Sequence, residues 1–282
     1  MPRRMSPEPW SVEDFRPIAA VLRTRPGGPL PPQRLDLIRA RLQARLRSRG
    51  LPSFTWFHDR VLRPRPEGSG MQMLIDLSTV NHTTFFREAA PLRYLAERLA
   101  ERLRGTATAS VRVWSAGCSA GQEPYSLAMA VAELVPVLAP GRFVGWASDM
   151  SSEMVRAAAR AIYEDRDLGD VSPDRLRRYF LRGRGPRQGA YRIVPEIRKL
   201  WNFLHFDLHE PDWPVPNDLD AVLCRNVAIY FAEAERRPLL ERLAGRLRGG
   251  GWLVVGNCEI LPDCPPMLRK VGPSIFRKES AP

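Results

Sequence analysis

The fold of this chain is decided by the stretch VRVWSAGCSAG, residues 111–121. Its first half, residues 111–116, is short and mostly apolar, which predicts a buried strand. Its second half, residues 117–121, is a glycine turn, and apolar residues at helical spacing follow from Gln122. A strand that runs through such a turn into a helix is typical of an α/β sheet, and the turn presents backbone N–H groups at the start of a helix.

Strands and helices alternate on both sides of this unit. The alternation predicts a doubly wound, mostly parallel sheet with helices on both faces. We predict helices at 88–104, 122–135, 151–163 and around 239–247, and strands at 111–116, 142–148, 220–224 and 252–255.

Two further parts flank or interrupt this core. The turn-rich segment RGRGPRQG, residues 182–189, is followed by YRIV, which predicts a small antiparallel β-subdomain inserted at about 176–204. Upstream, Leu35, Ile38, Leu42 and Leu46 recur at helical spacing in a helix that should begin near Pro31-Pro32 and stop at Gly50. The run RPRPEGSG, residues 63–70, reads as a linker. We therefore expect an all-helical N-terminal domain at 1–70 and an α/β domain at 71–282.

Composition excludes several classes of protein. The chain has 282 residues, of which 44% are hydrophobic and 26% charged, and it contains four cysteines. No apolar run approaches the roughly twenty residues of a membrane helix, and no apolar segment follows the basic start, so we expect a cytoplasmic protein without membrane insertion. Four cysteines are too few for a disulfide framework in a chain of this length. His205 and His209 have H-x3-H spacing, but the apolar and polar residues between them alternate as in a strand, and no metal site is predicted.

The net charge of +12 is concentrated near the N-terminus, where residues 1–65 hold 14 arginines and five acidic residues. This imbalance favours an acidic partner, such as nucleic acid, an anionic membrane or a carboxylate-rich protein surface. A solvated helix face with no partner explains the charge equally well.

Asp149 stands just after the predicted strand 142–148, where doubly wound sheets bind ligands and where an acid accepts hydrogen bonds from ribose hydroxyls. An N-cap for the following helix is the alternative role. The turn at 117–121 is neither G-x-G-x-x-G nor a phosphate loop with lysine, and it is not the G-x-S-x-G of a hydrolase. The glycine turn and the acid together favour a nucleoside ligand without a pyrophosphate, such as S-adenosylmethionine.

Three blocks carry a resemblance to a known family. They are NHTTFFRE at 81–88, WSAGCSAGQEPYS at 114–126 and CRNVAIYF at 224–231. In this order they resemble the signature blocks of the CheR chemotaxis receptor methyltransferases, and the likeness extends over about residues 10–277. The resemblance implies methyl transfer from S-adenosylmethionine to glutamate side chains of receptors, with S-adenosylhomocysteine as the second product.

The resemblance also implies which residues bind the methyl donor. At three places the chain departs from the family pattern: Asp207 stands for a usual asparagine, Gln122 for a common glutamate, and residues 256–259 for a stretch that usually contains serine. The change at Asp207 puts that contact in doubt. The implied cofactor residues are Asn81, Thr83, Arg87, Gly117, Glu123, Asp149, Asp207, Leu208, Arg225 and Asn226.

The reaction itself does not depend on a general base. A glutamate carboxylate is already ionised near pH 7, so displacement at a sulfonium methyl mainly requires alignment of the two reactants. The resemblance implies that Arg87 holds the incoming carboxylate and that Tyr230 orients it. Core packing is the alternative role for Tyr230, and it is the favoured one for Phe231, Phe85 and Phe86.

The resemblance suggests a receptor as the partner of the basic N-terminal helix, because the receptors are helical bundles with glutamate-rich faces. We expect docking through Arg39, Arg41, Arg45 and Arg49, and the inserted subdomain resembles one that grips a receptor's C-terminal tether in some members. We expect a monomer that binds no nucleic acid. Two rival hypotheses stay open: a nucleic-acid methyltransferase, suggested by the pI near 10.4, and a module that binds donor and receptor without catalysis.

Overall fold

The computed structural model describes residues 8–23, 32–78, 83–106, 108–135, 137–257, 259 and 264–280. The chain divides into two compact units, Met1–Val80 and Asn81–Pro282. The sequence predicted the boundary at residue 70, but helix α4 (Ser69–Ser78) belongs to the first unit, because Leu74 is fully buried in its core. Gly70 is a packing residue as well, since a Cβ there would lie 2.7 Å from Cγ1 of Val61.

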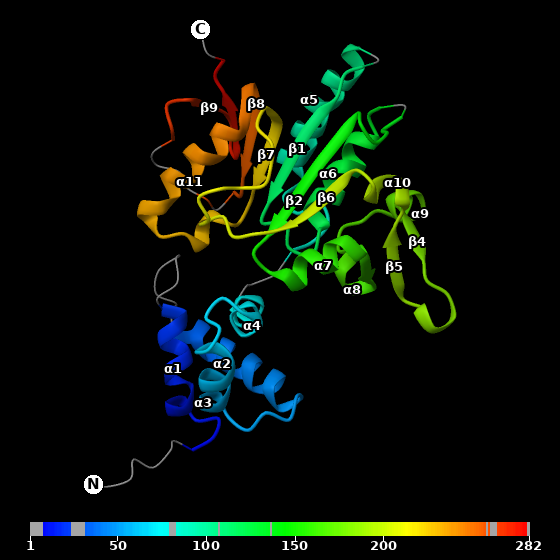
Figure 1. Ribbon diagram of the computed structural model, residues 1–282. Helices are drawn as coiled ribbons and strands as arrows, with labels where there is room; N and C mark the ends of the chain where they lie inside the picture. Colours follow the sequence, from blue (N-terminus) through cyan, green and yellow to red (C-terminus); the bar gives the residue numbers. More distant parts are fainter. Residues whose placement is uncertain are drawn as a thin grey trace, which may run out of the picture. The chain divides into compact units, whose positions relative to one another are not determined.

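The elements described in the first unit are all helices, as predicted, and are coloured blue to cyan in Figure 1. A buried carboxylate organises it: Asp14 accepts hydrogen bonds from the backbone N of Phe54 at 2.7 Å and of Thr55 at 2.9 Å, at the start of a short helix. The long basic helix ends at Arg47, and Gly50 after it has a φ of +67°, which allows the C-terminal turn in which Leu51 N bonds Leu46 O at 3.0 Å. The elements are α1 (Val12–Arg23), α2 (Pro32–Arg47), α3 (Phe54–Phe57), the π-helical turn η1 (His58–Leu62) and α4.

The second unit is built on a seven-stranded sheet with the order β6-β2-β1-β7-β8-β10-β9 (Figure 1). The five strands from β6 to β8 run parallel, and β10 pairs antiparallel with both β8 and β9. The predicted doubly wound, mostly parallel sheet is thus confirmed, with an antiparallel edge. The strands are β1 (Val111–Ala116), β2 (Phe143–Asp149), β6 (Trp201–His205), β7 (Leu219–Cys224), β8 (Leu247–Val255), β9 (Leu268–Gly272) and β10 (Ile275–Lys278).

Helices cover both faces of this sheet. Alternate residues of β1 enter two separate cores: Val111 and Val113 pack with α5 and α6, whereas Trp114 and Ala116 pack with α11. Helix α5 contacts β1 and also α6, and α11 contacts β7 and β8 (Figure 1). The helices are α5 (Ala89–Gly105), α6 (Gln122–Ala132), α7 (Ser152–Arg160) and α11 (Glu233–Arg246), with the 3-10 turn η3 (Ala228–Tyr230) before α11.

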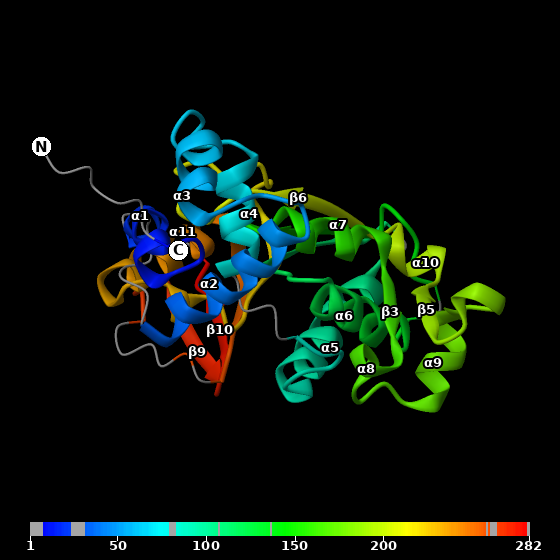
Figure 2. The same cartoon turned by 90° about the horizontal axis from the view of Figure 1, so that it is seen from below.

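The inserted subdomain is larger than the sequence predicted, because its sheet has three strands in the order β3-β5-β4. The first strand begins at Ile162, so the insertion starts before residue 176, and it ends before β6 at Trp201. Both views place it toward the β6 side of the large sheet, away from β9 (Figures 1 and 2). Its elements are β3 (Ile162–Glu164), α8 (Asp165–Leu168), α9 (Pro173–Tyr179), β4 (Phe180–Arg182), the 3-10 turn η2 (Gly185–Arg187), β5 (Ala190–Ile193) and α10 (Pro195–Arg198).

Three local predictions were wrong. The helix expected at 151–163 ends at Arg160, because Ala161 takes a left-handed conformation and Tyr163 joins β3. The glycines at 249–251 lie inside β8, where the register against β7 shifts, and do not merely separate a helix from a strand. Residues 206–208 lie beyond the end of β6, although their alternation resembles a strand. Among the described residues, no helix has the length and apolarity needed to cross a membrane.

Candidate functional site

Asp149 ends β2 and joins two loops at the carboxyl edge of the sheet. Its Oδ2 accepts a hydrogen bond from Ser119 N at 2.8 Å in the glycine turn, and its Oδ1 accepts one from Ser151 N at 2.9 Å. The N-cap of α7 is Ser151, whose Oγ accepts from Met154 N, so the capping role considered for Asp149 is wrong. The carboxylate therefore lies where the sequence placed a ribose acceptor.

The glycine turn after β1 requires glycine for two physical reasons. Gly117 and Gly121 have φ values of +79° and +94°, and only glycine adopts these without strain. A Cβ on Gly117 would also lie 2.3 Å from Cγ2 of Val227. The backbone N of Gly117 and of Cys118 both donate to Ser148 O at 2.8 Å, which fixes the turn against β2. The turn is therefore rigid and closely packed against the loop after β7.

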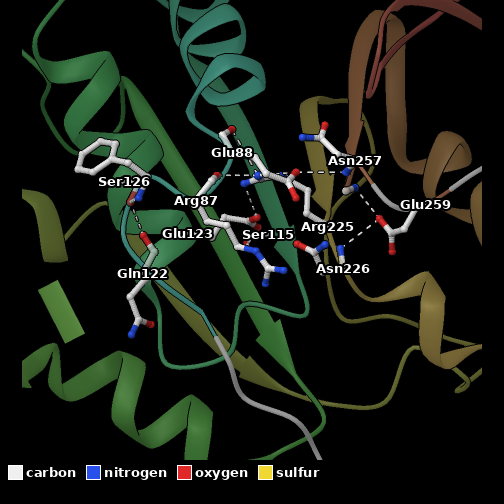
Figure 3. Close-up of polar contacts among 12 residues, drawn as sticks. Arg87, Glu88, Ser115, Gln122, Glu123, Ser126, Arg225, Asn226, Asn257 and Glu259 are labelled. Atoms are coloured by element: carbon white, nitrogen blue, oxygen red, sulfur yellow. Dashed lines mark hydrogen bonds and ion pairs between the residues drawn. The ribbon is translucent and has the colours of Figure 1, made fainter. Parts of the chain in front are cut away.

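Arg225, the residue after β7, is the centre of the polar network in Figure 3. Its side chain is 2% exposed and forms ion pairs with Glu88 at 3.1 Å and with Glu123 at 3.2 Å. Its Nη2 also donates to Arg87 O at 2.7 Å. The guanidinium thus connects the segment before α5 with the first turn of α6, so its structural role is to hold two predicted site segments together.

Glu123 is 13% exposed and lies in the first turn of α6. Burial raises the pKa of its carboxyl, and the positive charge of Arg225 opposes that shift. Ser115, on β1, donates to Glu123 Oε1 at 2.7 Å. A buried carboxylate with these partners can take a further cationic ligand group.

The segment 83–88 is held on its other side by α6. Phe86 N donates to Ser126 Oγ at 2.9 Å, and Ser126 Oγ donates to Gln122 O at 2.7 Å. Phe86 and Glu88 have left-handed backbone conformations, with φ of +56° and +49°. Arg87 lies between them and is partly buried, as is Thr83. The remaining predicted residue of this block, Asn81, lies outside the described residues.

Glu259 has a role in the site that was not predicted from the sequence. Its Oε1 accepts hydrogen bonds from Val227 N at 2.8 Å and Ala228 N at 2.7 Å. Its Oε2 accepts one from Asn226 N at 3.1 Å (Figure 3). Asn226 has a φ of +58°, which this carboxylate stabilises. The only sequence signal was an acid shortly after the apolar strand β8, which by itself is uninformative.

Tyr230 and Phe231 differ in exposure, as expected for a catalytic residue and a packing residue. Tyr230 is 36% exposed in η3, so core packing is not its role. Phe231 is buried and its ring stacks on that of His209 with centroids 4.2 Å apart. Phe85 is also a core residue, in edge contact with Tyr163. Phe231 and Phe85 are therefore packing residues, as predicted, and Tyr230 is not.

Asp207 and Leu208 follow β6. Leu208 is buried, while the Asp207 carboxylate accepts hydrogen bonds from His209 through both its backbone N and its ring Nδ1. His205, the other histidine of the H-x3-H pair, instead contacts Met150 O. Within the described residues there is no group of three or more side chains able to hold a metal ion.

The four predicted docking arginines lie on the helical unit and differ in exposure. Arg41 and Arg49 are exposed, and Arg49 stands beyond the end of α2. Arg39 and Arg45 are half-buried, and Arg39 pairs with Asp36 at 3.6 Å. Arg41 also donates to Leu77 O at 3.2 Å. The basic surface is therefore smaller than the sequence count suggests.

The donor set at the sheet edge fits S-adenosylmethionine. Two carboxylates, Asp149 and Glu123, suit its ribose hydroxyls and its ammonium group, and the glycine turn between them has no room for a side chain at Gly117. Fold and site together define an S-adenosylmethionine-dependent methyltransferase.

Comparison with known proteins identifies the family. A family model described as "CheR methyltransferase, SAM binding domain" matches residues 81–276. The chemotaxis protein methyltransferase of Escherichia coli (strain K12) is 36% identical over 245 residues, which are 87% of this chain and 83% of that protein. Chemotaxis protein methyltransferase 2 of Pseudomonas aeruginosa PAO1 is 33% identical over 267 residues, 95% of this chain and 93% of that protein. The chain therefore belongs to the CheR methyltransferase family.

Solved structures add little to this assignment. Magnesium protoporphyrin IX methyltransferase from Synechocystis PCC 6803 aligns with a TM-score of 0.32 at 17% identity, over 77% of this chain and 71% of that one.

Proposed function

We propose that this protein methylates glutamate side chains of chemoreceptors, producing γ-carboxyl methyl esters and S-adenosylhomocysteine and so setting adaptation in chemotaxis-type signalling. The family match over residues 81–276 carries the proposal. The arrangement of Asp149, Glu123 and the glycine turn at the carboxyl edge of the sheet supports it.

S-adenosylmethionine supplies an electrophilic methyl group on a sulfonium. We assign the ribose hydroxyls to Asp149 and the ammonium group to Glu123, whose carboxylate already pairs with Arg225 at 3.2 Å. The rest of the proposed donor site follows the family pattern and comprises Asn81, Thr83, Arg87, Gly117, Asp207, Leu208, Arg225 and Asn226.

Arg87 and Tyr230 are the proposed catalytic residues. The acceptor carboxylate needs no deprotonation at pH 7, so the task of the protein is to hold it in line with the methyl group. The guanidinium of Arg87 binds one carboxylate oxygen, and the hydroxyl of Tyr230, a side chain 36% exposed, orients the other. A tight ion pair would weaken the nucleophile, so we assign Arg87 to geometry more than to charge.

The receptor is the proposed partner of the helical unit. We propose that Arg39, Arg41, Arg45 and Arg49 dock on a glutamate-rich face of the receptor's helical bundle, and that the three-stranded subdomain takes up a C-terminal tether as an added strand. We further propose a cytoplasmic monomer that does not act on nucleic acid.

Incubation with methyl-labelled S-adenosylmethionine and receptor fragments tests the proposal. The expected result is a base-labile label on glutamates of the fragment. Tyr230→Phe should slow the transfer by about tenfold to a hundredfold while S-adenosylhomocysteine still binds. Label entering DNA or RNA would support the nucleic-acid alternative, and donor binding without label on any receptor fragment would support the non-catalytic one.

A further inference from the structure

His209 has no part in the proposed function, yet it makes three specific contacts at the end of β6. Its backbone N and its ring Nδ1 both bond Asp207 Oδ1, at 3.0 Å and 2.7 Å. Its ring lies flat on Phe231, with an angle of 15° between the planes. Its Nε2 is buried and has no hydrogen-bond partner within the described part of the chain. The hydrogen bonding of this ring is therefore directed at Asp207.

The strand order puts the residues after β6 next to the end of β2, where Asp149 lies. The glycine turn follows β1, Asp149 ends β2, and β6 lies on the far side of β2 from β1. His205, the last residue of β6, stands in register with Asp149. A nucleoside whose ribose is held by Asp149 extends across these strand ends, so its base reaches the residues that follow β6.

A carboxylate at this place distinguishes bases by the exocyclic group that they present to it. It is an acceptor only, so it bonds the exocyclic amino group of adenine and repels the carbonyl oxygen that hypoxanthine has at the same position. An asparagine amide, by contrast, presents a donor or an acceptor according to its rotation. The selection by Asp207 depends on a fixed carboxylate plane, and two hydrogen bonds to one oxygen provide it.

We propose that His209 is a positioning residue of the donor site: it fixes the Asp207 carboxylate as the acceptor for the amino group of the adenine base. This inference rests on the proposed function, because it takes S-adenosylmethionine as the ligand. The stack on Phe231 holds the ring in the orientation that the Nδ1 hydrogen bond requires.

The backbone of this loop is held by other contacts. Arg242, on α11, donates to Leu208 O at 3.0 Å and to Pro211 O at 2.9 Å, and its guanidinium lies 4.0 Å from the ring centroid of Trp213. Since these contacts do not involve His209, a substitution at His209 removes the ring's hydrogen bond to the carboxylate and leaves only the backbone one, while the loop keeps its path. This separates a positioning role from a purely structural one.

Calorimetric titration with S-adenosylhomocysteine and S-inosylhomocysteine tests the inference. We expect the wild-type protein to bind the adenosyl compound at least tenfold more tightly, since the site rejects a mispaired polar group. His209→Leu should weaken adenosyl binding by about fivefold to tenfold and reduce the preference to less than about threefold. His209→Asn should restore both, because its amide nitrogen takes the position of Nδ1.

His58→Leu is the matched control, since His58 Nδ1 also lies 2.8 Å from an aspartate, Asp59, but in the helical unit. It should leave both affinities unchanged. A wild-type protein that binds no S-adenosylhomocysteine overturns the proposed function itself. A wild-type protein without base preference, or a His209→Leu variant that keeps it, overturns the inference alone.

If thermal unfolding shows that His209→Leu does not fold, the comparison of His209→Asn with His209→Gln decides instead. The longer glutamine amide cannot place a donor at the Nδ1 position, so it should lose the preference that asparagine keeps. Equal preference in these two variants also overturns the inference.

Discussion

Replacing Arg225 with methionine should destabilise the protein, because Arg225 is buried and pairs with two carboxylates. The side chain is 2% exposed, and its removal leaves Glu88 and Glu123 facing each other without the shared cation. Removing one partner of a buried ion pair lowers the free energy of unfolding by about 3–5 kcal/mol. Glu88 and Glu123 are 17% and 13% exposed, so water reaches both, and we expect the lower end, about 3 kcal/mol or a hundredfold in the folding equilibrium.

A urea titration followed by tryptophan fluorescence measures this loss. Arg237→Met is the matched control, because Arg237 pairs with Glu241 at 3.0 Å on the surface of α11, with side chains 53% and 40% exposed. It should cost less than about 1 kcal/mol. The double variant Glu123→Gln/Arg225→Met should recover about 1 kcal/mol relative to Arg225→Met, because it removes one uncompensated carboxylate. If Arg225→Met costs no more than Arg237→Met, the network does not hold the site segments together and our account of it is wrong.

Three other substitutions test separate parts of the site. Asp149→Ala should weaken S-adenosylhomocysteine binding at least about a hundredfold by calorimetry, while Asp174→Ala, at a side chain 88% exposed, should not change it. Gly117→Ala should cost about 2–4 kcal/mol in urea, from positive φ and the clash with the neighbouring loop, whereas Gly245→Ala in α11, with nothing within 4 Å, should stabilise by about 0.5–1 kcal/mol. Burial raises the pKa of the Glu123 carboxyl in the folded protein. The stabilisation that this shift contributes is present below the unfolded-state pKa of about 4.3 and is lost as pH rises through the folded-state pKa. Glu123→Gln should therefore remove this pH dependence from the free energy of unfolding.

Most helices and strands of both units could be predicted because their sequence signals are local. Buried strands such as β1 and β7 are short and mostly apolar runs, and α2 shows its core face every three or four residues. The predictions were wrong where the backbone conformation differed from what the hydrophobic pattern indicated. Ala161 ends α7 in a left-handed conformation, and β3 then pairs with β5 across a separation of about thirty residues, which no local signal reveals.

The contacts that support the site were hidden for a related reason. Asp149 and Glu123 stand at recognisable positions after a strand and at the start of a helix. Glu259 and His209 act through partners that only folding brings near: Glu259 binds the backbone of residues 226–228, and His209 binds a side chain and stacks on Phe231. An isolated acid or histidine in a loop gives no indication of such partners.

The sequence by itself determined the fold class, the order of strands and helices around the glycine turn, and the family whose blocks this chain carries. It could do so because hydrophobic periodicity and glycine conformation act over a few residues. Tertiary structure alone decided that α4 belongs to the helical unit and that Arg225 is held between Glu88 and Glu123. Burial and charge pairing between distant segments depend on the path of the whole chain, and so they become visible only once that path is known.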